Sequence, residues 1–182
     1  MKISAIALLD ELKNRTGQHL QYAETLLLKP ENELNFRTSD ESWSVLECLE
    51  HLNRYGDFYL PEISNRISSS KTTPASDFRP GLLGNYFAKS MLPKEKLNRM
   101  KTPKAMNPIH SRLNREVVNK FIEQQQQLLY LLEKARHINL EKTKTAISIS
   151  RLITLKLGDT FRFVVYHNER HVAQAERCLK YG

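Results

Sequence analysis

Cysteine is scarce in this sequence, and long hydrophobic runs are absent. Cys48 and Cys178 are too few for the disulfide framework that stabilises small secreted domains. No stretch approaches the ~20 consecutive apolar residues that a membrane-spanning helix needs. The first residues, MKISAIALLDELKNR, hold a short apolar run, but Asp10 and Glu11 follow at once and no small-residue cleavage site appears. We therefore expect a cytoplasmic protein with no signal peptide and no membrane partner.

The overall composition is that of a soluble globular protein. Hydrophobic residues make up 40% and charged residues 26% of the chain, and 182 residues suit one domain covering 1–182. The formal charge is +8, and residues 89–104, KSMLPKEKLNRMKTPK, contribute six Lys or Arg against one Glu. This basic loop has two prolines and no periodic apolar face, so a solvated surface explains it better than a nucleic-acid site. We do not expect nucleic acid to be a partner.

Apolar residues recur with helical spacing in four segments. The pattern predicts helices over about residues 4–28, 42–67, 114–136 and 159–180. The second helix has the clearest start, because Ser44 and Glu47 form an S-x-x-E capping box and Trp43 is placed to pack on Cys48. The Gln run 124–127 falls within the third helix, and we expect it on the helix surface.

The segments between these helices are less regular. The connection 68–113 is long for a compact domain, which indicates a functional loop or a crossover of the bundle. The stretch GLLGNYF within it favours a short helix or turn, and residues 138–157 alternate enough for a brief extended segment. Four amphipathic helices with one long crossover loop predict an all-α four-helix bundle, a fold that builds metal sites from inward-facing side chains.

Three histidines each lie at the edge of the apolar stripe of a predicted helix. HNERHVAQAE, residues 167–176, places His167 and His171 four residues apart on one helix face, and both flank the apolar stripe. His51 flanks the stripe of the second helix in the same way. Three neutral imidazoles with an open fourth position are typical of a catalytic divalent metal site, for which zinc or nickel is favoured and iron is an option. The alternative is that all three are structural or solvated histidines.

Four other residues are candidates for roles around such a site. Glu47, one turn before His51, is a candidate general base, but as the acid of the capping box it can instead bind backbone N–H groups. Gln174 could orient a metal-bound water. Tyr86 and Phe87 could wall a pocket, beside which the lysines of the basic loop would attract an anionic substrate.

Two motifs of the chain resemble a known family. ESWSVLECLEHLNRYGDFYLPEI resembles the W-S-x-x-E-x-x-x-H-L stretch of the DinB-like (YfiT-like) superfamily, and LGDTFRFVVYHNERHVAQAERCL resembles its closing G-x-x-x-x-F-x-x-x-H-x-x-R-H-x-x-Q stretch. The resemblance implies a bundle with up-down-down-up topology. It also implies a divalent metal, commonly nickel or zinc, held by His51, His167 and His171.

The same resemblance bears on function without selecting one activity. The family includes thiol-dependent S-transferases, a maleylpyruvate isomerase and domains of sulfoxide-forming enzymes, and many members are named only as metal-dependent hydrolases. We therefore expect a metal-dependent thiol S-transferase or hydrolase that acts on a small molecule, with a low-molecular-weight thiol as an optional cofactor. The alternative is a non-catalytic metal- or ligand-binding bundle protein with a stress-related role. A homodimer is a further expectation from the resemblance.

Overall fold

Within the described residues, 2–92 and 102–181, the computed structural model has four long helices. They are α1 (Ala5–Leu26), α3 (Val45–Ser68), α5 (Glu116–Lys134) and α6 (Leu157–Tyr181). Each lies within a few residues of the predicted range. The shorter elements are the helices α2 (Glu31–Leu34) and α4 (Leu82–Met91), the 3-10 turns η1 (Lys104–Met106) and η2 (Ala135–His137), and the strands β1 (Ile3–Ser4), β2 (Asp77–Phe78), β3 (Lys144–Ile147) and β4 (Ser150–Lys156).

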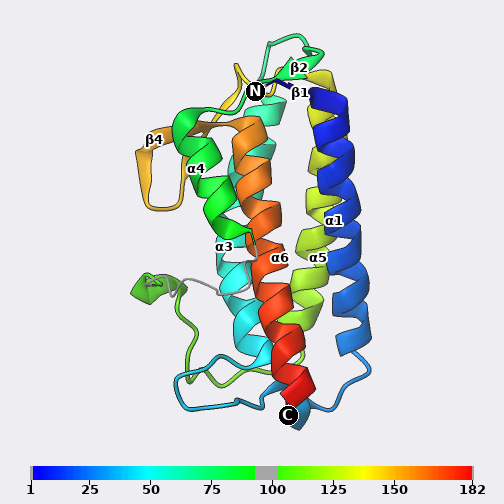
Figure 1. The fold of residues 1–182 in the computed structure, drawn as a ribbon, viewed down its shortest axis with the longest axis vertical. Coiled ribbons are helices and arrows are strands. Elements are labelled where there is room, and N and C mark those ends of the chain that lie inside the picture. The colour runs from blue at the N-terminus through cyan, green and yellow to red at the C-terminus, as the bar shows by residue number, and fades with distance from the viewer. Residues whose placement is uncertain (1, 93–101, 182) are drawn as a thin grey trace.

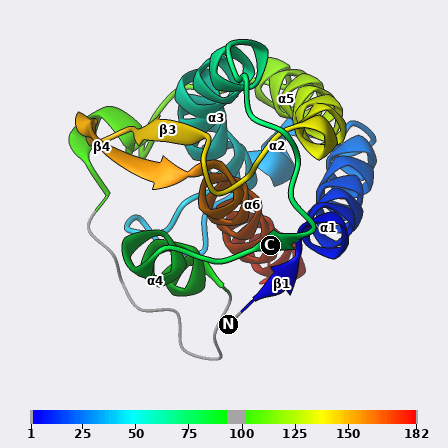
Figure 2. The same ribbon diagram turned by 90° about the horizontal axis from the view of Figure 1, so that it is seen from above.

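The four long helices form a bundle in which α1 and α6 run one way and α3 and α5 run the other (Figure 1). Helix α5 packs between α1 and α3, and α6 contacts the same two helices from the opposite side (Figure 2). This order confirms the all-α bundle and the up-down-down-up topology. Because α3 and α5 are parallel, the chain must return along the bundle between them, which explains the long crossover.

Local capping sets the start of α3 as predicted. The Ser44 hydroxyl accepts a hydrogen bond from the Glu47 N–H at 3.2 Å, and the Glu47 carboxylate accepts one from the Ser44 N–H at 2.8 Å. These bonds satisfy N–H groups that the first turn of a helix would otherwise leave unpaired. The helix then continues through Pro61 to Ser68.

The crossover is more structured than a loop, because it contains β2, α4 and η1. The predicted short helix is confirmed as α4, which packs on α6 (Figure 2). Asp159 at the start of α6 accepts a hydrogen bond from the Gly81 N–H at 2.7 Å and one from Arg162 at 3.1 Å. Arg162 also donates to Asn85 at 3.0 Å, so buried polar groups join α4 to α6.

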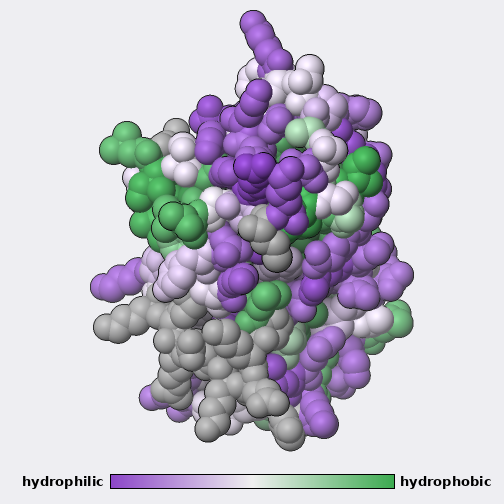
Figure 3. Space-filling model, turned by 45° about the horizontal axis from the view of Figure 1, so that its top comes forward, coloured by the Kyte–Doolittle hydropathy of each residue, from purple (hydrophilic) through white to green (hydrophobic). Residues whose placement is uncertain are grey.

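The predicted extended segment is a β-hairpin. Strands β3 and β4 pair antiparallel, with Thr145 opposite Leu155, and the register is irregular between Ala146 and Ile147. The hairpin and α4 leave large apolar side chains exposed, and Figure 3 shows a hydrophobic patch at the left of the molecule, on their side. The exposed apolar side chains of these two elements are Leu82, Leu83, Tyr86, Ile149, Leu152 and Ile153.

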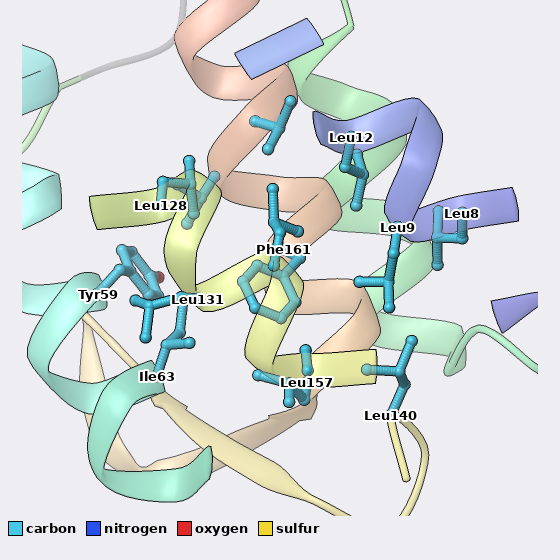
Figure 4. Close-up of a cluster of buried hydrophobic side chains, with 14 of the residues drawn as sticks. Leu8, Leu9, Leu12, Tyr59, Ile63, Leu128, Leu131, Leu140, Leu157 and Phe161 are labelled. Carbon is cyan, nitrogen blue, oxygen red and sulfur yellow. The ribbon is translucent and has the colours of Figure 1, made fainter. Parts of the chain in front are cut away.

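Two apolar clusters fill the bundle, one at each end. The first gathers residues from the start of α1, the ends of α3 and α5 and the start of α6, around Phe161 (Figure 4). The second lies around Leu49 and Phe121 at the opposite end. Between the two clusters, the helices contribute a layer of buried polar side chains: Thr16, His19, His51, Asn53, Gln124, Gln125, His167, Asn168 and His171. The candidate histidines belong to this polar layer.

Candidate metal centre

His51 of α3 meets His167 and His171 of α6 inside the bundle. The Nε2 atoms of His51 and His167 lie 3.1 Å apart, and one ligand atom from each of the three residues lies within 4.8 Å of the others. Two nitrogens bound to one tetrahedral zinc ion at ~2.0–2.1 Å would be about 3.3–3.4 Å apart. The three side chains are buried, with 3%, 5% and 8% of their surface exposed, and their spacing could hold a metal ion.

In two of these histidines, the hydrogen bond made by the ring leaves the same nitrogen, Nε2, available to bind a metal. Nδ1 of His51 donates to the carbonyl oxygen of Met106 at 2.6 Å, because a carbonyl oxygen can only accept. Nδ1 of His171 donates to Oε1 of Gln174 at 3.0 Å. In each neutral ring Nε2 therefore keeps its lone pair, the arrangement found in metal-binding histidines whose second nitrogen is held by an outer partner. Gln174 thus contacts a candidate ligand, where the sequence suggested contact with a bound water.

Burial keeps the three rings neutral. It lowers the pKa of His51 to about 4, and burial together with the nearby His51 ring lowers the pKa of His171 to about 3. The pKa of His167 lies well below its usual value, first through burial and then through the neighbouring His171 and His51. At neutral pH all three are therefore in the unprotonated state that a metal ion requires.

Aromatic side chains surround the histidines. Tyr55 lies one turn after His51 on α3, with its ring centre 5.0 Å from that of His51 and 4.7 Å from that of His167. Phe163, one turn before His167 on α6, stacks on the His167 ring at 5.6 Å. Trp43 lies 4.7 Å from His51. Neither Tyr55 nor Phe163 was expected at the site from the sequence, although both share the four-residue spacing that selected the histidine pair.

A narrow cavity runs beside His167 toward α5. It is lined by Tyr55, Gln124, Gln125 and Asn168, among others, and its ≈ 10 Å³ of accessible space is about the room that one water molecule needs. The expectation that the Gln run lies on the surface is wrong for its first two residues, which are 9% and 2% exposed. Gln125 accepts a hydrogen bond from Asn168 at 2.9 Å, and Gln124 donates to the Asn53 carbonyl at 3.0 Å, so each is paired inside the bundle.

Glu47 is occupied by contacts other than the histidines. Arg37 donates to both of its carboxylate oxygens, at 2.9 and 2.5 Å, in addition to the Ser44 backbone bond. Although burial opposes ionisation, the hydrogen bonds from Arg37 and Ser44 lower the pKa of Glu47. Through these contacts Glu47 is a charged capping residue of α3. Its role as a general base stays a prediction. Next to it, Cys48 is fully buried, which raises the pKa of its thiol and suits packing.

The remaining candidates lie apart from this group. Tyr86 is 68% exposed and contacts Phe87, with ring centres 5.8 Å apart, so the structure places it on the surface rather than in a pocket wall. Lysines 94, 96 and 101 of the predicted basic loop lie outside the described residues. Two further histidines, His110, which bonds to Arg37, and His19 on α1, do not belong to the three-histidine group.

Comparison with known protein families assigns the chain to a family. The family model of the DinB superfamily matches residues 7–175, nearly the whole chain. The chain belongs to the DinB superfamily. Comparison with curated proteins finds no match, and comparison with solved structures finds none either. DinB membership and the three-histidine group together fit a metal-binding protein of this superfamily.

Proposed function

We propose that this chain is a divalent-metal-dependent enzyme that acts on a small molecule, as a thiol S-transferase or a hydrolase. The observation that supports it is the convergence of three buried, neutral imidazoles from two antiparallel helices, His51, His167 and His171. Nitrogen donors of this kind favour nickel or zinc, with iron as a third option. When bound, such an ion supplies Lewis acidity at the coordination position that three protein ligands leave open.

The residues around the histidines favour thiol transfer over hydrolysis. Trp43, Tyr55 and Phe163 form a largely apolar surround that suits the apolar part of a substrate. Hydrolysis would need a general base to activate water, and the candidate base Glu47, one turn before His51, is engaged by Arg37 and Ser44. A thiol cofactor brings its own nucleophilic sulfur, so the protein needs to supply less acid–base catalysis.

The second candidate is a non-catalytic metal- or ligand-binding bundle protein. It is favoured by the small cavity beside His167 and by the engagement of Glu47 in the helix cap. Turnover separates the two candidates, because a metal-loaded enzyme converts thiol conjugates or esters and a binding protein does not. A raised KM with little change in kcat, in Tyr55→Leu or Phe163→Leu protein that still binds metal, would assign the aromatic surround to substrate binding.

The test of the metal site is the metal content of protein purified without a His tag or chelator. We expect about one nickel, zinc or iron per chain by elemental mass spectrometry, and none in His51→Ala or in His167→Ala/His171→Ala protein. His137→Ala, on the exposed turn η2, is the matched control and should keep its metal. If wild-type protein takes up no metal even after reconstitution, the metal-dependent function is wrong.

Further properties expected from the sequence stay proposals. A cytoplasmic location, a small-molecule substrate and a homodimer belong here, and light scattering tests the dimer against the chain mass of 21.2 kDa. Among the described residues no helix is both long enough and apolar enough to span a membrane.

A further inference from the structure

We propose that Arg54 is a positioning residue for the metal centre, because it holds the turn whose carbonyl oxygen orients His51. This inference rests on the proposed metal site. It concerns a contact between the bundle and the crossover rather than the histidines themselves. Two observations carry it, the origin of the carbonyl and the bonds that hold its turn.

The carbonyl that orients His51 does not come from the bundle. Met106 lies in η1, 55 residues along the chain from His51, and its oxygen lies 2.6 Å from Nδ1 of the imidazole. Both Met106 and the turn around it are partly exposed. A short surface turn therefore decides which nitrogen of a buried imidazole carries the hydrogen, and with it whether Nε2 is free to bind a metal.

Arg54 attaches this turn to α3. Its Nη1 donates to the carbonyl oxygens of Ala105 and Asn107, both at 3.2 Å, and these two residues flank Met106 in sequence. Nε of the same guanidinium donates to Glu50 at 2.8 Å, which fixes the side chain along the helix. Since Arg54 follows His51 by three residues on α3, one helix supplies both the candidate ligand and the brace for the group that orients it.

A second ion pair on the same helix shows what Arg54 adds. Arg66 makes the same bond to the residue four before it, Glu62, at 2.8 Å. Among the described residues Arg66 has no hydrogen bond to another segment, whereas Arg54 reaches across to the crossover. Removing Arg66 therefore removes an ion pair of the same spacing and length without touching the turn at Met106, while Glu62 keeps its hydrogen bond from the Ala146 N–H at 2.8 Å. It is the matched control for Arg54.

The positive charge of Arg54 and its positioning role predict opposite changes in metal affinity when Arg54 is removed. A cation close to a metal site opposes metal binding, so electrostatics alone would make Arg54→Ala bind metal more tightly than wild type. Positioning predicts the opposite sign. We expect the zinc affinity of Arg54→Ala to fall about 10- to 100-fold, as is typical when an outer partner of a metal ligand is lost. Arg54→Lys keeps the charge and one donor group, and should recover part of the loss.

The experiment measures zinc affinity by competition with a chromophoric chelator, in wild type, Arg54→Ala, Arg54→Lys and Arg66→Ala. In parallel, nitrogen–proton NMR of the metal-free proteins reports which ring nitrogen of His51 carries its hydrogen. We expect Nδ1–H in wild type and Arg66→Ala, and a mixture of both forms in Arg54→Ala.

The outcomes separate this proposal from the proposed function. If Arg54→Ala binds zinc as tightly as wild type or more tightly, or keeps the Nδ1–H form, the positioning role is wrong. The positioning role is also wrong if Arg66→Ala weakens zinc binding as much as Arg54→Ala does. Both losses would then come from a less stable helix α3. If wild type binds none of zinc, nickel and iron, the metal-dependent function fails, and the NMR comparison still decides whether Arg54 sets the form of His51.

Discussion

At the scale of single residues, burial controls the charge of the histidines, and His19 shows this effect away from the candidate metal centre. His19 is 4% exposed, and its Nδ1 has no hydrogen-bond partner among the described residues. Burial, with a smaller contribution from the charge of Arg15, lowers its pKa to about 4. The unfolded chain takes up a proton near pH 6.5 and the folded chain only near pH 4, so the unfolded state binds more protons in between.

The stability of the protein should therefore fall as the pH is lowered from about 6.5 to 4. His19 alone should contribute a loss of roughly 2–3 kcal/mol between pH 7 and pH 4.5, and His19→Leu should remove that share. Urea unfolding of both proteins at the two pH values, with chelator present, measures the difference. The three candidate metal ligands titrate in both proteins, so their contribution to the pH dependence of stability cancels in the comparison. An equal loss in wild type and His19→Leu would show that His19 is protonated in the folded protein.

At the scale of helices and strands, two glycines inside helices have opposite surroundings. A Cβ added to Gly84 of α4 would lie 2.5 Å from the side chain of Asp159, so this glycine permits α4 to approach α6. A Cβ added to Gly17 in the middle of α1 would meet nothing within 4 Å. Glycine lowers helix stability by about 1 kcal/mol relative to alanine where no contact depends on it.

We expect Gly17→Ala to stabilise the protein by about 0.5–1 kcal/mol and Gly84→Ala to destabilise it by about 1–3 kcal/mol. The second change forces α4 away from the buried group formed by Asp159, Arg162 and Asn85. Urea unfolding measures both free energies, and each variant controls for the change in helix propensity of the other. A stabilising effect of Gly84→Ala would mean that α4 does not pack on α6 as closely as the structure shows.

The elements that could be predicted from the sequence are those that depend on local chemistry. The four long helices follow from apolar periodicity, and α3 begins where its capping box sets it, at Ser44. The buried position of Gln124 and Gln125 could not be predicted, because it depends on polar partners on other helices, Asn53 and Asn168. Met106 was missed for the same reason, since no sequence pattern places a crossover carbonyl beside His51.

At the scale of the whole molecule, the candidate centre joins parts of the chain that are far apart in sequence. His51 and His167 are 116 residues apart, so a metal that binds both favours the folded state over the unfolded chain. Only the three histidines themselves could be inferred from sequence spacing. Their meeting depends on the antiparallel packing of α3 and α6, which is a property of the complete bundle (Figure 1).

Metal binding should therefore raise the unfolding temperature. Free metal at 100 times its dissociation constant adds about 2.7 kcal/mol, which corresponds to roughly 5–10 °C for a chain of this length. Differential scanning calorimetry with zinc and with chelator measures the shift. His167→Ala, compared at the same zinc concentration, should show almost none. A similar shift in that variant would mean that zinc binds the protein elsewhere.

The chain carries a single tryptophan, and that residue lies beside the candidate centre. The ring centre of Trp43 is 4.7 Å from that of His51 and 5.5 Å from that of His171. Its indole emission is therefore an intrinsic optical probe of the site. A paramagnetic ion such as nickel or cobalt at the three histidines would quench this emission strongly, whereas closed-shell zinc would leave most of it. The intensity of the tryptophan emission can then distinguish bound zinc from a bound paramagnetic ion, without any label.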